Sequence, residues 1–201
     1  MSAGGDLTVI LGPMSSGKTT ELWNMCKVAI HGGLSVLFIN HADDNRSETF
    51  LSSHDPVLNK VKLSEVEFDA TKTDKLMDIL CVTENYDMIA VDECQRFNDL
   101  PEFTAVLVNE KRKEVVIAGL NCNSDEEPMG KIKDVILLAD NIILKKGYCV
   151  KCKDQGRKRV FAIRSYKFAG DPTNKNEIGG QDKYMAVCRN CFSELTKNKF
   201  K

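Results

Sequence analysis

One short segment constrains this chain more than any other. Residues 12–19 read GPMSSGKT and fit the pattern G-x-x-x-x-G-K-[ST]. The apolar run 7–11 (LTVIL) precedes this segment, and the helix-compatible stretch 18–31 (KTTELWNMCKVAIH) follows it until Gly32 and Gly33. The order predicts a strand, a glycine-rich loop and a helix. In such a setting the backbone N–H groups surround phosphate oxygens, and the helix start adds a positive dipole end.

The loop predicts a nucleotide site with divided roles. Lys18 should contact the β and γ phosphates of ATP, and Thr19 should reach Mg²⁺ through its hydroxyl, because these positions have those roles in loops of this kind. The alternative is a chance glycine-rich turn. We expect every residue of the loop to bind nucleotide: Gly12, Pro13, Met14, Ser15, Ser16, Gly17, Lys18 and Thr19.

Two acidic residues follow another apolar run. Residues 86–92 read YDMIAVD, and Asp92 and Glu93 stand where this run ends. Parallel sheets bind ligands at the carboxyl ends of their strands. We expect Asp92 to lie near Mg²⁺ or to bind it, and Glu93 to accept a proton from an attacking hydroxyl or water. A solvated strand end is the alternative interpretation.

The apolar runs predict the fold class. Further short runs alternate with segments of helical or mixed character, and they lie at 35–40, 86–92, 114–120 and 141–147. We expect a helix around 73–84, and the mixed segment between 92 and 114 could hold another. This alternation indicates an α/β fold, a P-loop parallel sheet with flanking helices.

Composition separates the last quarter of the chain from the rest. The 201 residues are enough for one substantial core and a small appended module. Residues 1–144 hold 13 Lys or Arg against 24 Asp or Glu, whereas residues 145–201 hold 15 against 5. The basic quarter is either a solvated surface or a site for a phosphate-bearing or acidic partner. We place the domain boundary between 1–145 and 146–201.

The chain also lacks the usual addresses for export or membrane insertion. It has no run of about 18 apolar residues, and its start shows no basic region followed by an apolar stretch and a cleavage site. We therefore expect a soluble, cytoplasmic protein without a membrane partner.

Eight cysteines divide into two classes. Two C-x-x-C pairs supply four thiolates, which favours a closed, structural zinc site formed by Cys149, Cys152, Cys188 and Cys191. The 35 residues between the pairs exceed what a compact ribbon needs, so the metal should pin the base of a long loop. A nucleic-acid-binding ribbon and a site without metal are the alternatives. We expect ordinary buried thiols at the four single positions, Cys26, Cys81, Cys94 and Cys122.

Several motifs occur together in the order found in one enzyme family. Besides the loop LGPMSSGKT, they are 42–46 (ADDNR), 53–55 (SHD), 91–95 (VDECQ) and 178–184 (IGGQDKY). The chain resembles the type-II thymidine kinases over nearly its whole length, and both cysteine pairs fall where that family has its zinc ligands. The resemblance implies transfer of the γ-phosphoryl of ATP to the 5′-hydroxyl of thymidine or deoxyuridine, in nucleotide salvage for DNA synthesis.

The resemblance also implies residue roles. Glu93 would be the general base, with Lys18 as the second catalytic residue; Asp44 and Arg46 would lie near the metal and phosphates, and Gln95 close by. Residues 146–201 would form a zinc-ribbon and lasso domain that closes over the nucleoside, and the enzyme would be a homotetramer or homodimer. The implied substrate-binding residues are Phe97, Leu120, Ser124, Met129, Ile178, Gly179 and Tyr184.

The sequence departs from the family pattern around the nucleoside. Arg96 follows the D-E-x-Q element at a position where the family commonly has an aromatic residue. Ser124 and Met129 occupy positions where the family usually has phenylalanines, and the family usually has a threonine around the position of Ala162. Each lost aromatic stack should cost about 1 kcal/mol, unless Phe97 or another neighbouring aromatic side chain fills the space. A kinase with altered nucleoside specificity and a P-loop, zinc-ribbon ATPase that binds nucleic acid are the alternatives; we rank nucleic acid as an unlikely partner.

Overall fold

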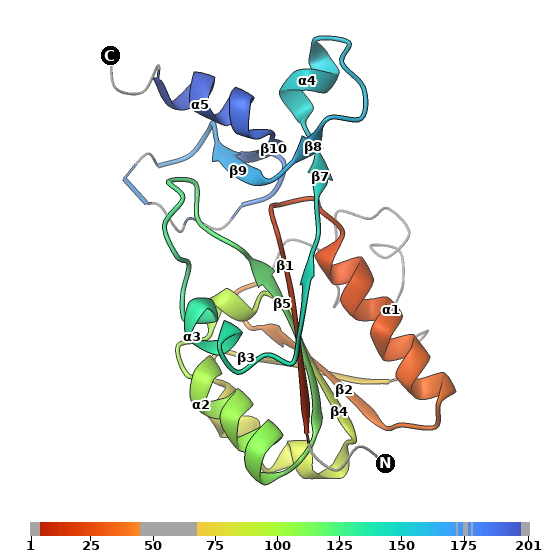
Figure 1. Cartoon of the computed structure of the whole chain (residues 1–201). Coiled ribbons are helices and arrows are strands. Elements are labelled where there is room, and N and C mark those ends of the chain that lie inside the picture. Colours follow the sequence, from red (N-terminus) through yellow and green to blue (C-terminus); the bar gives the residue numbers. More distant parts are fainter. Residues whose placement is uncertain (1–4, 45–67, 172, 175–176, 178, 198–201) are drawn as a thin grey trace.

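The computed structural model describes residues 5–44, 68–171, 173–174, 177 and 179–197. Its centre is a six-stranded, entirely parallel sheet in the order β3-β2-β4-β5-β1-β6 (Figure 1). The expected parallel α/β sheet is therefore confirmed. The strands are β1 (Asp6–Gly12), β2 (Val36–His41), β3 (Asp69–Thr73), β4 (Met88–Val91), β5 (Glu114–Leu120) and β6 (Asn141–Leu144).

The sequence patterns missed the edge strand β3. Its residues DATKT contain no apolar run, and only Thr73 is buried. An edge strand pairs on one side only and faces solvent along the other, so it does not need the continuous apolar pattern of the central strands.

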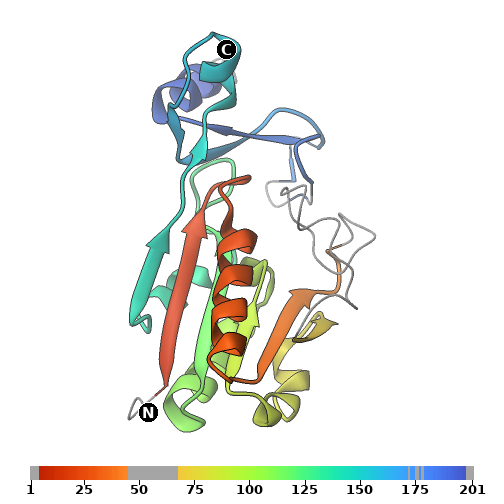
Figure 2. The same cartoon turned by 90° about the vertical axis from the view of Figure 1, so that its right-hand side faces the viewer.

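Helices cover both faces of the sheet. Helix α1 (Lys18–His31) lies on one face, and α2 (Leu100–Ala105), its π-helical continuation η6 (Val106–Glu110) and α3 (Ile132–Ile136) lie on the other (Figures 1 and 2). No helix in the described part of the chain has the length and apolar character needed to cross a membrane.

The expected helix around 73–84 is wrong as a single element. The segment forms two short 3₁₀ helices, η3 (Leu76–Ile79) and η4 (Val82–Asn85). The Thr83 hydroxyl donates a hydrogen bond to the Leu80 carbonyl at 2.6 Å, and such local side-chain bonds compete with a continuous helix. The β-branched pair Val82 and Thr83 adds to this, since branched side chains lose rotamer freedom in a helix.

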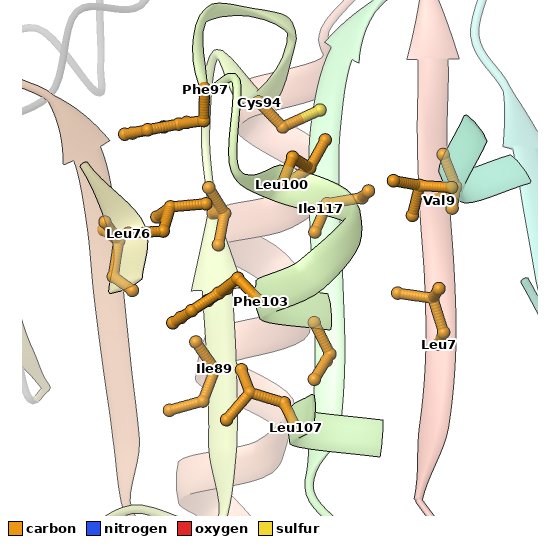
Figure 3. Packing of buried hydrophobic residues seen from close by; sticks show 14 of the residues in the cluster. Leu7, Val9, Leu76, Ile89, Cys94, Phe97, Leu100, Phe103, Leu107 and Ile117 are labelled. Carbon is orange, nitrogen blue, oxygen red and sulfur yellow. The ribbon is translucent and has the colours of Figure 1, made fainter. Parts of the chain in front are cut away.

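Alternation along the strands produces two apolar layers. In β1, for example, Leu7, Val9 and Leu11 pack beneath α2 and α3, while Ile10 packs against α1. Figure 3 shows the first layer, in which Leu7 and Val9 lie alongside side chains from α2 and β4. Because the central strands are buried on both faces, their ends are held in place by packing.

The C-terminal elements form a separate small core beyond the carboxyl end of β1, opposite the N-terminus (Figures 1 and 2). Two antiparallel pairs, β7 (Gly147–Tyr148) with β8 (Phe161–Ala162) and β9 (Arg164–Lys167) with β10 (Tyr184–Val187), join α4 (Val150–Asp154) and α5 (Arg189–Lys197). We call residues 146–197 the C-terminal module. The division into domains at residue 145 stays a prediction.

The single cysteines agree with expectation except in one case. Cys26, Cys94 and Cys122 are buried, but Cys81 is exposed, so the expectation is wrong there. Cys81 lies between η3 and η4 on the surface of the sheet layer, and the shortened helices leave its side chain outside the core. All eight cysteines are free thiols.

Candidate active site

The glycine-rich loop connects β1 to α1 in a conformation that its residues explain. Gly17 caps α1 with a φ of 78°, and Ser15 also has a positive φ, of 55°. A Cβ atom at Gly12 would lie 2.6 Å from both the Lys145 carbonyl oxygen and the Ser16 hydroxyl. Only glycine therefore fits at position 12, where the loop turns back against the chain that leaves β6.

The interior of the loop offers polar groups to a ligand. The Ser16 hydroxyl is buried and has no hydrogen-bond partner among the described residues. Lys18 is also buried, and its ammonium group donates to the Pro13 carbonyl at 2.8 Å. A buried, unpaired hydroxyl is costly, and a phosphate oxygen at the start of α1 would satisfy it. The loop therefore fits the phosphate groups of a nucleotide.

One loop N–H group is already engaged. The Met14 N–H donates to the Ser165 hydroxyl of β9 at 2.9 Å, although the two residues are 151 positions apart. Ser165 was not among the expected site residues, and a lone serine after a cysteine pair carries no sequence signal for such a contact. This bond ties the loop to the C-terminal module.

The loop and the end of β4 meet at a hydroxyl and a carboxylate. The Thr19 hydroxyl donates to Asp92 Oδ2 at 2.8 Å, and the Glu93 N–H donates to Asp92 Oδ1 at 2.9 Å. Asp92 is only 2% exposed. A hydroxyl beside a buried carboxylate is an oxygen donor set suited to a hard divalent cation such as Mg²⁺. The structure thus brings together the two residues that the sequence predicted for magnesium.

Glu93 is held in an unusual backbone conformation. Its φ is 50°, in the left-handed region, where a non-glycine residue stores strain of order 1 kcal/mol or more. Gln95 donates to Glu93 Oε2 at 2.6 Å, and Arg96 Nε lies 4.0 Å from the same oxygen. The carboxylate is mostly buried yet remains 13% exposed, so it is placed to accept a proton from a group entering the site.

Asp44 lies just beyond β2 and is completely buried. Its carboxylate accepts from the Asn40 side-chain amide at 3.0 Å, and its carbonyl accepts from the Lys72 ammonium at 2.8 Å. The family resemblance implies that Asp44 and Arg46 lie near the metal and phosphates. Arg46 lies outside the described residues.

His41 links this strand end to the segment after Glu93. Its ring lies 4.8 Å from the ring of Phe97, and burial together with the nearby Arg96 lowers the pKa of His41 below its usual value. Phe97 itself is completely buried within the apolar layer. Its predicted contact with a nucleoside stays a prediction.

The remaining expected substrate residues fall into two groups. The first group lies at the end of β5, where Leu120 is the last strand residue, and in the loop that follows, where Ser124 is buried and Met129 is partly buried. The Leu120 N–H donates to Gln95 Oε1 at 3.1 Å. This loop is joined to β9 by an ion pair between Glu126 and Arg164. The second group belongs to the long loop before β10.

The long loop is anchored by an ion cluster that the sequence did not reveal. The Glu177 carboxylate accepts from Lys167 and Lys183, each at 2.5 Å, and from the Asp171 N–H at 2.9 Å. The two lysines hold the pKa of Glu177 at about 2. The Tyr184 hydroxyl donates to the Glu177 carbonyl at 2.6 Å, which places Tyr184 against the same loop.

Of the two further residues that the family resemblance implies in this loop, Ile178 and Gly179, the structure describes only Gly179. Gly179 is partly buried, and a Cβ atom there would lie 2.7 Å from the Lys183 side chain. Ile178 lies outside the described residues. The contact between Lys167 and Glu177 could not be predicted from the sequence, because a lysine ten positions before an acidic residue is a common spacing.

The four paired cysteines converge on one point. Their Sγ atoms all lie within 4.8 Å of one another, with 3.6 Å from Cys152 to Cys191 and 3.8 Å from Cys152 to Cys188. Tetrahedral coordination with Zn–S bonds of about 2.3 Å requires sulfur atoms about 3.8 Å apart. The first pair belongs to the start of α4 and the second to the start of α5. The cluster fits a structural zinc ion.

Comparison with known proteins identifies the family. The thymidine kinase family model matches residues 5–192. The chain belongs to the thymidine kinase family. The predicted resemblance to the type-II thymidine kinases is thereby confirmed, and ATP as the phosphoryl donor follows from kinase membership.

Curated thymidine kinases of poxviruses match this member of the family along almost their whole length. The thymidine kinase of Amsacta moorei entomopoxvirus is 35% identical over 195 residues, covering 93% of this chain and 97% of that protein. The thymidine kinase of Variola virus is 33% identical over 190 residues, covering 94% and 97%. Among solved structures, the flagellar accessory protein FlaH of Methanocaldococcus jannaschii aligns with a TM-score of 0.47 and 14% identity over 84% of this chain and 74% of that chain.

Proposed function

We propose that this chain is a thymidine kinase that transfers the γ-phosphoryl of ATP to the 5′-hydroxyl of thymidine, or of deoxyuridine, giving the 5′-monophosphate. The observation that carries the proposal is the meeting of the phosphate loop, the Thr19–Asp92 contact and Glu93 at one edge of the sheet, in a chain of this family. The family match does not favour the alternatives of another nucleoside or of a nucleic-acid-binding ATPase.

The nucleotide binds along the loop and the start of α1. The unpaired Ser16 hydroxyl and the N–H groups of the first helical turn bind phosphate oxygens, and Lys18 moves from the Pro13 carbonyl to the β and γ phosphates. Asp44 follows β2, the strand next to β4, and we assign it to the nucleotide side of the site. The family resemblance gives Arg46 the same task.

Thr19 and Asp92 hold Mg²⁺ in this proposal, because their oxygens already lie 2.8 Å apart. When bound, the ion supplies positive charge beside the β and γ phosphates, which stabilises the charge that spreads over the transferred phosphoryl. The buried Asp92 positions Thr19 for this task through the hydrogen bond that it accepts.

Glu93 accepts the proton of the 5′-hydroxyl as that oxygen bonds to the γ-phosphorus and the bond from this phosphorus to the bridging oxygen breaks, which releases ADP. Its strained backbone places the carboxylate at the tip of β4, beside Gln95 and Arg96. A positioned general base typically contributes on the order of 10²- to 10⁴-fold to the rate.

The C-terminal module closes over the nucleoside as a lasso. The four thiolates would hold zinc and so tie the start of α4 to the start of α5 at the base of the loop, while the Glu177 ion cluster shapes the loop itself. Tyr184 and Gly179 approach the sugar and base from this side, and Leu120, Ser124 and Met129 approach from the other. The departures from the family pattern at Arg96, Ser124, Met129 and Ala162 would alter base affinity.

Assembly and location complete the proposal. We place the enzyme in the cytoplasm as a homotetramer or homodimer, following the family resemblance. Light scattering of the purified, zinc-loaded enzyme at several concentrations measures the assembly directly.

The test is ATP-dependent phosphate transfer to thymidine, deoxyuridine, deoxycytidine, deoxyadenosine and deoxyguanosine, with a control lacking nucleoside. We expect thymidine to be the best acceptor and Glu93→Gln to lower kcat on the order of 10²-fold or more, with the thermal midpoint unchanged. Glu110→Gln, at the exposed end of η6, is the matched control and should keep full activity. Hydrolysis of ATP without any acceptor would contradict the proposal.

A further inference from the structure

We propose that Gln95 is a positioning residue that orients the Glu93 carboxylate, and that it acts on the general base rather than on the nucleotide. This inference rests on the proposed role of Glu93. The side chain of Gln95 is almost completely buried, and its amide donates to Glu93 Oε2 at 2.6 Å. A bond of this length to a carboxylate is a strong, charge-assisted one.

The end of β5 fixes which way the Gln95 amide points. The Leu120 N–H can only donate, so the Gln95 atom 3.1 Å away must be the carbonyl oxygen. The NH₂ group of the same amide therefore faces Glu93. Because Leu120 contributes a backbone group at the end of a buried central strand, this orientation does not depend on another mobile side chain.

Two glycines make room for Gln95. A Cβ atom at Gly119 would lie 2.5 Å from Gln95 Oε1 and 2.7 Å from the Cys94 sulfur. A Cβ atom at Gly130 would lie 1.9 Å from the backbone carbonyl oxygen of Gln95, and Gly130 has a φ of 57°. The surrounding chain is thus fitted closely around Gln95, as expected for a residue whose position matters.

The short 3₁₀ helix η5 (Cys94–Arg96) carries Gln95 and is itself anchored. Cys94 and Phe97, on either side of Gln95 in the sequence, both lie in the apolar layer shown in Figure 3. Burial and the nearby acids raise the pKa of the Cys94 thiol, so this side chain stays neutral and adds no charge beside Glu93.

The charged groups around Glu93 come from its own strand end and from η5. The Glu93 N–H donates to Asp92 Oδ1 at 2.9 Å, and Arg96 Nε lies 4.0 Å from Glu93 Oε2. Gln95 is a neutral donor to that same oxygen, so it fixes the direction of the carboxylate without adding charge.

The decisive experiment measures kcat and the KM values for ATP and thymidine at saturating Mg²⁺. We expect Gln95→Met, which has no donor, to lower kcat about 10-fold while KM for ATP changes by less than about 2-fold, because the carboxylate loses the hydrogen bond that aims it. Gln95→Glu, which has the same shape but places a second carboxylate beside Glu93, should lower kcat further. Gly119→Ala, which displaces the amide oxygen without changing Gln95, should lower kcat in the same way.

The control and the opposing outcomes are distinct. Gln155→Met, on the surface of the C-terminal module, should leave kcat and both KM values unchanged. If Gln95 instead binds nucleotide, Gln95→Met and Gln95→Glu will raise KM for ATP and leave kcat unchanged, which overturns the inference. A wild-type enzyme that phosphorylates no nucleoside refutes the proposed function itself.

Discussion

The carboxyl edge of the sheet and the C-terminal module hold their functional groups by different means. At the sheet edge, Asp92 and Glu93 follow a strand that is buried on both faces, so apolar packing fixes them. In the C-terminal module the apolar core is small, and four thiols and the Glu177 ion cluster carry the structure. The residues that we propose for phosphate chemistry thus lie on the rigid part, whereas Gly179 and Tyr184, which we propose for the nucleoside, lie on the part that the thiol cluster and ion pairs hold.

Several contacts among the described residues connect the two regions. The Met14 N–H binds Ser165, Glu126 pairs with Arg164, and a Cβ atom at Gly147 would lie 3.3 Å from the Ser15 carbonyl oxygen. The module therefore rests directly on the phosphate loop. A change in the module should reach nucleotide binding through these contacts.

Removing the metal should produce the largest difference in stability between the C-terminal module and the sheet. Structural zinc sites contribute on the order of 10 kcal/mol to folding, so a chelator or Cys191→Ser should unfold the module and abolish transfer to thymidine. The sheet should remain folded and bind ADP with an affinity reduced less than about 10-fold. Limited proteolysis across residues 146–190 and ADP titration measure the two effects. An unchanged proteolysis pattern in zinc-free enzyme would contradict the prediction.

Ser165→Ala should show how strongly the regions are coupled. The change leaves the buried Met14 N–H without its acceptor, which costs about 1 to 2 kcal/mol. We expect a lower thermal midpoint together with weaker ATP binding, measured by calorimetry. Ser193→Ala, on the exposed face of α5, is the matched control. Unaltered ATP affinity in Ser165→Ala would mean that the two regions work independently.

Acid should affect the module only at low pH. The two lysines lower the pKa of Glu177 to about 2, whereas the ordinary pKa of a glutamate is about 4.3. The ion pairs of Glu177 therefore stabilise the folded loop fully at a pH above about 4.3, and this stabilisation is lost as the pH falls from about 4.3 toward 2. Glu177→Gln should make the loop before β10 more sensitive to protease at pH 7 and remove this acid step. Glu194→Gln on α5 serves as the control. Equal protease sensitivity of wild type and Glu177→Gln would exclude a clamping role.

The stability of the sheet should begin to fall at a higher pH than that of the module, although by a small amount. Since burial and Arg96 lower the pKa of His41, the folded state binds fewer protons than the unfolded state as the pH falls below about 6.5. The thermal midpoint should drop by about 1 or 2 °C between pH 7.5 and 5.5, and His41→Gln should flatten that slope. His31→Gln, at the exposed end of α1, should keep it. A slope that survives in His41→Gln points to another group.

The sequence predicted the features that depend on local spacing. Motif and strand order placed the phosphate loop after β1 and two acids after β4, because residues next to one another in the chain must share a strand end. The C-x-x-C pairs predicted a metal cluster for the same reason, since each pair spans one helix start. The expected helix at 73–84 and the buried state of Cys81 failed because local hydrogen bonds and surface position outweighed composition.

Tertiary structure alone decided which distant groups meet. Ser165 reaches Met14, Leu120 orients Gln95, and Lys167 pairs with Glu177 only because the sheet and the module fold against one another and upon themselves. No periodicity or spacing encodes such contacts, since each joins segments that approach only after loops close. The sequence therefore determined the chemistry at each strand end, and the packing of separate elements decided how those groups are aimed and coupled.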